Sequence, residues 1–329
     1  MTKPEESGTL GETRMYWLHA QSPLHVGAGR GIGFIDLPIA REVVTNWPFI
    51  PGSAVKGVLA DVHGVTDQTR KDQSLHRQAF GLAGDESSNS GSLIITDAHL
   101  VCLPVRSLYG TFAWCTSPIA LERLRRDLQR SNSVGTLPTV SIPPGSDGTL
   151  QIHVTSKTAS VLMEPQANSR RAYFEDLDFD VVLCANADQW AIALSQWLFD
   201  DPAWRALFVE RFAVVPDDDV FSFLSETAMQ VDARVRIDDA SKTVADGQLW
   251  YEECLPPETI LAGLAWCGPV FGDKARGDTS RRDEIARSFC SDARLLQLGG
   301  KATVGRGQVR MSFGTPKADE AGAGKDGAA

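Results

Sequence analysis

The stretch HVGAGRGIGFIDLPIAREVVTNWPFIPGSAVKG, residues 25–57, joins a glycine-rich loop to the start of a helix. Before it, residues 15–20 (MYWLHA) predict a strand, because their side chains alternate between two faces. After Pro51, the apolar residues between Val55 and Val62 fall on one face of a helix, and we expect Ser53 to cap its first turn. The ordered chain therefore begins as strand, glycine loop and helix.

Further strands and helices alternate along the rest of the chain. Residues 92–96 predict a strand, and Ser117 and Pro118 open a helix with leucines on one side and arginines on the other. Residues 131–148 are rich in Ser, Gly and Pro, which indicates a linker or a long excursion. A second glycine-rich loop, LGGKATVGRG at residues 298–307, precedes a last strand. This order predicts an α+β fold.

Length and composition limit the kind of protein. The 329 residues are 43% hydrophobic and 22% charged, as in a globular chain with a sizeable core. We expect a single domain at residues 14–314, between flexible polar tails at 1–13 and 315–329. No stretch approaches the roughly 20 apolar residues of a membrane span, and we expect the polar N-terminal residues not to act as a signal peptide. The six cysteines form no C-x-x-C pair, so we expect reduced thiols and a cytoplasmic protein.

The formal net charge of −10 is concentrated in one window. Residues 172–226 hold twelve acids against Arg205 and Arg211, while acids and bases balance in the rest of the chain. A balanced remainder can gather its bases on one face, so the acidic total does not exclude a nucleic-acid partner. We interpret the window itself as a solvated face.

The two glycine-rich loops do not match the common nucleotide-binding motifs. Neither contains G-x-G-x-x-G, and the chain has no G-x-x-x-x-G-K-[ST]. Glycines nevertheless let backbone amides approach a phosphate chain, and the loops carry bases, Arg30 in the first and Lys301 and Arg306 in the second. This combination suits a polyanion. For either loop alone, a tight turn with a solvated base is an equally open alternative.

Two polar residues near the first loop are candidates for chemistry. The histidines show no zinc-binding spacing and G-x-S-x-G is absent, which leaves His25 as the histidine to test as a proton carrier or RNA contact. Asp36, in the apolar run after the glycines, could ligate a hard metal or orient a ribose 2′-hydroxyl for attack on the adjacent phosphate. The alternative is that Asp36 caps a turn and pairs with Arg41, and the residues alone favour it.

Taken in order, several stretches of the chain resemble one known family. They are residues 25–57, GSLIITDA at 91–98, PVRSLYGTFAW at 104–114, DGQLWYEE at 246–253, LPPET at 255–259 and residues 298–307. The chain is similar to the RAMP superfamily of CRISPR proteins and, more narrowly, to the repeated backbone subunit of the type III-B effector complex. Each glycine motif is weak alone, but the ordered set covers most of the chain.

The resemblance implies a modified ferredoxin-like palm, related to the RRM fold, with inserted fingers and a thumb hairpin. We place the thumb and the acidic insertion within about residues 140–245. It also implies that several copies stack along a CRISPR RNA beside other subunits, and that each thumb interrupts the duplex of guide and target RNA. The target RNA is then cut at regular intervals, with a divalent metal, Mg²⁺ or Mn²⁺, as cofactor.

Carried onto this sequence, the catalytic and metal-binding aspartate of the family is Asp36, with His25 as its helper. Guide recognition that ignores base sequence must rest on phosphate contacts. The residues expected to make them are Gly27, Gly29, Arg30, Arg41, Ser53, Lys56, Gly299, Gly300, Lys301 and Arg306. We expect no membrane partner, and we place the acidic window away from the guide or against a basic neighbour.

Two other functions stay open at this point. Ala40 stands where the family commonly has a polar residue, often Gln, which alters the surroundings of Asp36. The chain could be a scaffold subunit of the same complex that binds the guide without cutting. It could also be a stand-alone endoribonuclease that processes guides without a metal, with His25 as acid or base.

Overall fold

The computed structural model describes residues 13–29, 31, 33–71, 74–82, 88–131, 137–140, 148–165, 170–270 and 279–314. Except for residue 13, the two predicted tails lie outside these ranges, as do Arg30 and most of the stretch 131–148. No helix in the part of the chain that the structure describes is long and apolar enough to cross a bilayer.

The centre of the fold is a four-stranded antiparallel sheet with two crossover helices. Across the sheet the strands are β16 (Gln308–Phe313), β1 (Arg14–Ala20), β14 (Ile260–Cys267) and β5 (Leu93–Ile95). Helix α1 (Gly52–Val62) lies between β1 and β5 in the sequence, and α9 (Thr279–Phe289) lies between β14 and β16. This is the βαββαβ connectivity of a ferredoxin-like unit. The predicted strand at 15–20 and helix after Pro51 are confirmed.

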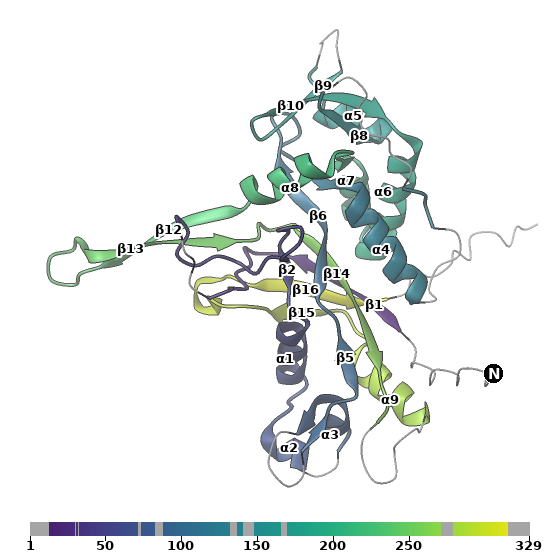
Figure 1. Ribbon diagram of the computed structural model, residues 1–329, viewed down its shortest axis with the longest axis vertical. Coiled ribbons are helices and arrows are strands. Elements are labelled where there is room, and N and C mark those ends of the chain that lie inside the picture. Colours follow the sequence, from purple (N-terminus) through teal and green to yellow (C-terminus); the bar gives the residue numbers. More distant parts are fainter. Residues whose placement is uncertain are drawn as a thin grey trace, which may run out of the picture.

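Further strands extend this sheet at both edges (Figure 1). Beyond β16 there is one further strand, β15 (Arg294–Gln297). On the other side, β6 (Ala98–Arg106) pairs with β14 beside β5, each along a different part of β14. Beyond β6 follow β7 (Phe112–Thr116), β11 (Phe212–Val214), β8 (Gln151–Val154), β10 (Leu177–Leu183) and β9 (Arg171–Phe174). The pairs β7–β11 and β8–β10 are parallel, so the sheet is mixed. Short pieces complete the sheets: β2 (Phe49–Ile50), β3 (Gly81–Leu82) and β4 (Asn89–Ser90).

Both faces of the central sheet are covered, so β1 is buried on both sides. Tyr16 belongs to the apolar cluster that includes residues of α1 and α9. Trp17, its neighbour on the opposite face, belongs to the cluster formed with α4 (Pro118–Arg130) and α6 (Ala185–Leu198). Because successive side chains of β1 point to opposite faces of the sheet, the strand contributes to both hydrophobic cores. The predicted opening of α4 is also confirmed, because the Ser117 hydroxyl accepts a hydrogen bond from the Ala120 amide at 3.3 Å.

The acidic window, residues 172–226, is part of the main fold and not a separate subdomain. Its strands β10 and β11 are part of the extended sheet. Its remaining elements include α7 (Pro202–Val209) and α8 (Asp218–Thr227), and α5 (Ser156–Leu162) precedes it. These elements form the upper part of the molecule in Figure 1.

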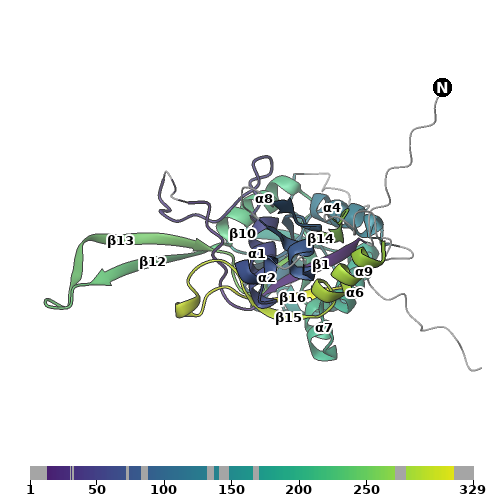
Figure 2. The same ribbon diagram turned by 90° about the horizontal axis from the view of Figure 1, so that it is seen from below.

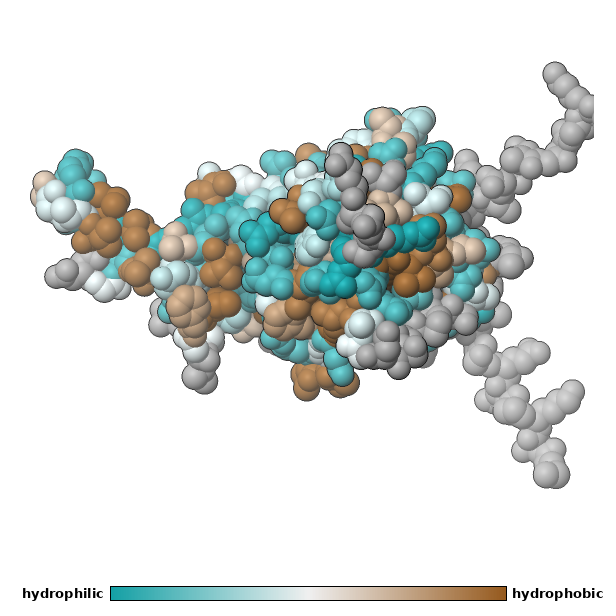
Figure 3. Space-filling model, turned by 90° about the horizontal axis from the view of Figure 1, so that it is seen from above, coloured by the Kyte–Doolittle hydropathy of each residue, from teal (hydrophilic) through white to brown (hydrophobic). Residues whose placement is uncertain are grey.

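A long hairpin projects from the body of the molecule (Figures 1 and 2). It consists of β12 (Gln230–Ile237) and β13 (Val244–Cys254), which form a separate two-stranded sheet. The first strand lies within the region 140–245 where the thumb was expected, and the second continues to Cys254. Apolar side chains are exposed along the hairpin in Figure 3; they are Val231, Val235, Ile237, Val244 and Leu249.

The start of α1 differs from the sequence prediction. Pro51 is the N-cap and makes no side-chain capping bond, so Ser53 lies inside the first turn and the predicted cap is wrong. The carboxylate of Asp97 takes that place, because its Oδ1 accepts from the Gly52 amide at 2.7 Å. A Cβ at Gly52 would stand 2.4 Å from the carbonyl oxygen of Ile95, so only glycine allows this close packing. Two short helices follow α1: α2 (Asp67–Lys71) and α3 (Leu75–Phe80).

Candidate functional site

The loop that follows β1 is joined to the root of the projecting hairpin. The Leu37 amide donates to the carbonyl of Tyr251 at 3.1 Å, and the Glu253 amide donates to the carbonyl of Leu37 at 3.0 Å. Leu37 and Glu252 form an isolated parallel bridge, so the loop runs directly beside β13 at this residue. The first loop and the second glycine-rich loop flank the hairpin root on opposite sides (Figure 2).

Asp36 is an exposed carboxylate fixed by this junction. Its Oδ2 accepts a hydrogen bond from the Tyr251 amide at 2.8 Å. It lines a cavity of about 510 Å³ together with Gly31, Leu37, Gly247, Leu249, Trp250 and Lys301. The predicted pairing of Asp36 with Arg41 is wrong, because the Arg41 guanidinium pairs with Glu253 at 2.5 Å. The carboxylate of Asp36 therefore remains open to the cavity on the solvent side.

Two buried carboxylates organise the bases around the hairpin root. Glu252 accepts from Lys301 Nζ and from Trp250 Nε1, each at 2.7 Å, and Arg234 Nε lies 3.4 Å away. Burial alone would raise the pKa of Glu252, but these donors and cations outweigh it and hold the pKa below its ordinary value. Glu253 accepts from the Ile39 amide at 3.1 Å in addition to Arg41. Glu252 and Glu253 thus position two of the bases predicted to contact RNA, Lys301 and Arg41.

His25 lies buried where the two glycine-rich loops meet. Its Nδ1 donates to the carbonyl of Glu253 at 2.7 Å, and its own carbonyl accepts from the Gly300 amide at 3.0 Å. Gly299 has a φ of 73°, and a Cβ there would stand 2.2 Å from the His25 carbonyl oxygen. A Cβ at Gly27 would stand 2.9 Å from His25 Nε2. His25 therefore ties both loops to the hairpin root, and its part in proton transfer stays a prediction.

The remaining predicted RNA contacts are distributed over several places. Arg306 pairs with Asp232, and its Nη1 lies 3.6 Å from the sulfur of Cys254, so it braces the hairpin root. Lys56 points inward from α1 and donates to the carbonyl of Leu93 at 2.6 Å, and burial lowers its pKa. Ser53 and Gly29 are exposed. The structure therefore gathers His25, Asp36, Lys301 and the glycines at the hairpin root, whereas α1 lies apart against β5.

The donor set at Asp36 allows a divalent cation only in company with a nucleic acid. Within the described ranges, no group of three or more His, Cys, Asp or Glu side chains is placed to hold a metal ion. Mg²⁺ binds through one or two carboxylates together with phosphate oxygens and water. Asp36 supplies one such carboxylate beside the cation of Lys301, so phosphates would have to supply other ligands.

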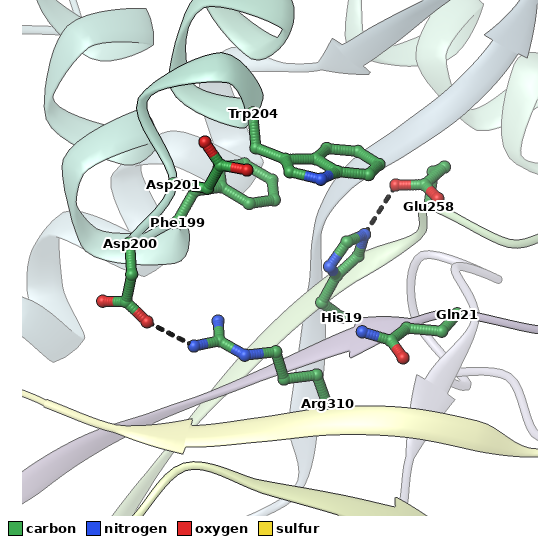
Figure 4. A pocket seen from close by; sticks show the side chains of 8 residues that line it. All are labelled: His19, Gln21, Phe199, Asp200, Asp201, Trp204, Glu258 and Arg310. Carbon is green, nitrogen blue, oxygen red and sulfur yellow. Dashed lines mark hydrogen bonds and ion pairs between the residues drawn. The ribbon is translucent and has the colours of Figure 1, made fainter.

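A second cavity, of about 530 Å³, lies between α6–α7 and the strands β1 and β16 (Figure 4). Its acids are engaged within the protein. Asp200 pairs with Arg310 at 2.6 Å, and Glu258 pairs with His19 at 2.6 Å. Asp201 caps α7 by accepting from the Ala203 amide at 2.8 Å. The acids of this second cavity therefore have structural roles, and the Asp36 cavity is the candidate site.

Sequence reasoning missed the aromatic residues at the site. Phe34 is 73% exposed and stacks on Tyr251, with ring centroids 4.6 Å apart. Trp250, which precedes Tyr251 in the sequence, lines the Asp36 cavity. The signal available was an aromatic residue placed just before Asp36 in a loop, but nothing local indicates that Phe34 faces solvent rather than the core.

The connectivity of the fold and the carboxylate held at the hairpin root are those expected of a RAMP protein, and the comparison with known proteins agrees. The chain belongs to the RAMP superfamily, which matches residues 17–310. This confirms the family predicted from the ordered motifs.

Its relatives are more specific. The CRISPR system Cmr endoribonuclease Cmr4 of Pyrococcus furiosus is 30% identical over 302 residues, which cover 90% of this chain and 94% of that protein. The crystal structure of oligomeric Cmr4 from Pyrococcus furiosus superimposes with a TM-score of 0.66 at 24% identity, covering 93% of this chain and 99% of the other. A chain of the type III-B Cmr-beta complex bound to cognate target RNA gives a TM-score of 0.66 at 18% identity, covering 92% and 98%. The two structures show the same α+β fold.

Proposed function

We propose that this chain is the repeated backbone subunit of a type III-B CRISPR effector complex. In that role it binds the guide RNA along its phosphates and cuts complementary target RNA at regular intervals. The observation that carries the proposal is the exposed carboxylate of Asp36, fixed at the root of a projecting hairpin in a cavity shared with Lys301. Similarity to a Cmr endoribonuclease over 90% of the chain supports the same activity.

The cleavage step proposed for the Asp36 cavity is an attack by a ribose 2′-hydroxyl on the adjacent phosphorus. The 2′-oxygen loses its proton to water as it forms a bond to phosphorus, the bond to the 5′-oxygen breaks, and the leaving oxygen takes a proton from water. The products carry a 2′,3′-cyclic phosphate and a 5′-hydroxyl. Asp36 orients the attacking hydroxyl, and Lys301 faces the negative charge that grows on the phosphate. Glu252 holds the Lys301 ammonium group through their 2.7 Å contact.

Metal dependence is part of the proposal. A Mg²⁺ or Mn²⁺ ion bound by Asp36 and RNA phosphates would supply further stabilisation of the phosphate charge. The exposed position of Asp36 supports this role, since among the described residues the hydrogen bond to its side chain is to Oδ2 and Oδ1 remains available for a ligand or a hydroxyl.

The hairpin β12–β13 is assigned as the thumb. Attack in line with the leaving oxygen requires a backbone geometry that a stacked duplex forbids, and a nucleotide turned out of the stack provides it. The hairpin projects beyond the body of the protein (Figure 2), and Asp36 is hydrogen-bonded to its root at Tyr251. A duplex interrupted by the hairpin would therefore be distorted beside Asp36.

The assembly follows from phosphate recognition. Amides of the glycine-rich loops and the bases beside them contact phosphates without regard to base sequence, so one subunit can be repeated along any guide. Further copies of this chain and other subunits of the complex are its protein partners. We place the complex in the cytoplasm, with its target RNA.

The test is a cleavage map of guide-complementary RNA in the reconstituted complex. Wild type is compared with Asp36→Asn and with the matched control Asp61→Asn, which alters an exposed carboxylate on α1. We expect regularly spaced cuts in wild type and in the control, and none in Asp36→Asn, with guide and target binding retained in all three. Intact RNA with normal binding in wild type would make the chain a scaffold.

A second arm of the same experiment tests the metal. We expect EDTA to stop cutting without releasing the target RNA, and added Mg²⁺ or Mn²⁺ to restore it. Cutting that persists in EDTA would leave Asp36 acting without a metal and would overturn the cofactor part of the proposal.

A further inference from the structure

Phe34 is a large aromatic residue of the loop whose ring is mostly in water. It is 73% exposed, although Ile39 and Ala40 in the same loop are buried. One side of the ring is covered by Tyr251, with ring centroids 4.6 Å apart and an angle of 29° between the planes. Among the residues that the structure describes, Tyr251 is the aromatic ring recorded against Phe34, and the other side of the Phe34 ring is exposed.

The stacked pair is rigidly linked to the candidate catalytic carboxylate. Tyr251 contributes its ring to the pair, and its main-chain amide donates to Asp36 Oδ2 at 2.8 Å. The next loop residue, Leu37, is hydrogen-bonded to the carbonyl of the same Tyr251 at 3.1 Å. A planar group resting on Phe34 would therefore keep a fixed position relative to Asp36.

The Asp36 cavity, whose lining includes residues close to Phe34 and Tyr251 in the sequence, combines apolar surface with the cation of Lys301. Leu249 and Trp250 line the Asp36 cavity, and Lys301 lies in the same lining. Aromatic platforms with a nearby cation are how proteins hold single-stranded nucleic acids, because every base has a π-face and every nucleotide a phosphate. An apolar protein segment would use the ring but not the ammonium group.

We propose that the exposed side of Phe34, backed by Tyr251, stacks the nucleobase next to the scissile phosphate of the target RNA. This rests on the proposed function and adds a positioning residue to it. Phe34 acts through the nucleotide, whose base it holds while Asp36 faces the ribose. Since any base can stack, the contact helps to position every target sequence alike.

The experiment uses the guide-loaded complex and a target RNA with one abasic nucleotide beside a single cut site. The other cut sites on the same RNA serve as internal controls. Phe34→Leu removes the π-face with little change in volume, and Phe34→Tyr is the conservative variant. The single-turnover rate is measured at each site, and assembly of the complex on the guide is checked by native mass measurement.

We expect Phe34→Leu and the abasic nucleotide to remove the same contribution to the cleavage rate. Phe34→Leu should slow cutting at all sites by about 10- to 100-fold, the range that base–aromatic stacking supports. The abasic nucleotide should slow its own site to a similar extent in wild type, and add little in Phe34→Leu. Phe34→Tyr should cut at close to the wild-type rate.

Three outcomes would overturn the inference. They are an unchanged rate in Phe34→Leu, an abasic effect as large in Phe34→Leu as in wild type, and a loss of assembly before any target is added. The last would assign Phe34 to a contact between protein copies. Failure of the proposed function is a different result, since wild type itself would then make no regular cuts.

Discussion

Replacing Glu42 by Gln should lower the free energy of unfolding by about 3 kcal/mol at pH 7, and by less as the pH falls. The Glu42 carboxylate joins the turn after the candidate site to β6 and α4. Its Oε1 lies 2.6 Å from His99 Nδ1, and its Oε2 lies 2.8 Å from Arg123. The Thr45 hydroxyl also donates to it, at 2.5 Å. The variant removes the charge from this partly buried cluster and keeps the shape of the side chain.

The magnitude follows from the pKa of Glu42. Burial raises this pKa, but hydrogen bonds from His99, Thr45 and Arg123 lower it from 4.5 to about 2. A pKa depressed in the folded state gives stability that is present above the unfolded value and lost as the pH falls toward the folded one. At about 1.4 kcal/mol for each pKa unit, the contribution is about 3 kcal/mol at pH 7 and about 1 kcal/mol at pH 3.

The assay is urea unfolding of both proteins at pH 7, 5 and 3. The matched control is Glu122→Gln on the surface of α4, where the carboxylate is 54% exposed and lies 3.6 Å from Arg125. We expect the control to change stability by less than about 0.5 kcal/mol, as exposed ion pairs do. The reasoning is refuted if Glu42→Gln costs no more than the control at pH 7, or if its cost stays the same at pH 3.

Other predictions concern the loops and the thiols. Gly299→Ala should destabilise the protein by at least about 3 kcal/mol in urea unfolding, and Gly305→Ala by about 1 kcal/mol. Both glycines have left-handed φ, but only at Gly299 would the added Cβ meet a backbone oxygen. Equal losses of stability in the two variants would contradict this. Lys301→Ala should slow single-turnover cleavage by about 10- to 100-fold for any target sequence, and Lys301→Arg should recover most of the rate; unequal slowing of unrelated targets would exclude a phosphate contact. Cys184 should be the one thiol that reacts quickly with DTNB in the native protein, because the other five are buried and burial raises their pKa values; a second fast thiol would refute this.

Local sequence patterns predicted the parts of the fold that depend on near neighbours. The alternation in β1 and the apolar face of α1 are visible within a few residues, and both elements form as expected. The glycines at 299 and 300 signal close backbone approach, and Gly299 does lie against His25. Asp36 became a candidate through its position in an apolar run after glycines, and the structure places it in a solvent-accessible cavity.

Partners distant in the sequence could not be predicted in this way. Asp36 is held by an amide 215 residues away, and Arg41 finds its carboxylate 212 residues away rather than at Asp36. The cap of α1 comes from Asp97 because β5 brings that carboxylate to the helix, which no spacing near Ser53 reveals. The exposure of Phe34 has the same origin, since only the fold decides that its ring meets Tyr251 and water.

The bond between the first loop and the hairpin root has a consequence for the pattern of cuts. Because Leu37 and Asp36 are hydrogen-bonded to Tyr251, the projecting hairpin and the carboxylate move as one piece. The point where the hairpin enters a duplex and the point where the carboxylate acts are then a constant distance apart, set by the protein. In the proposed function, a row of such subunits works as a ruler, and the lengths of the RNA fragments measure the repeat of the protein rather than any feature of the RNA.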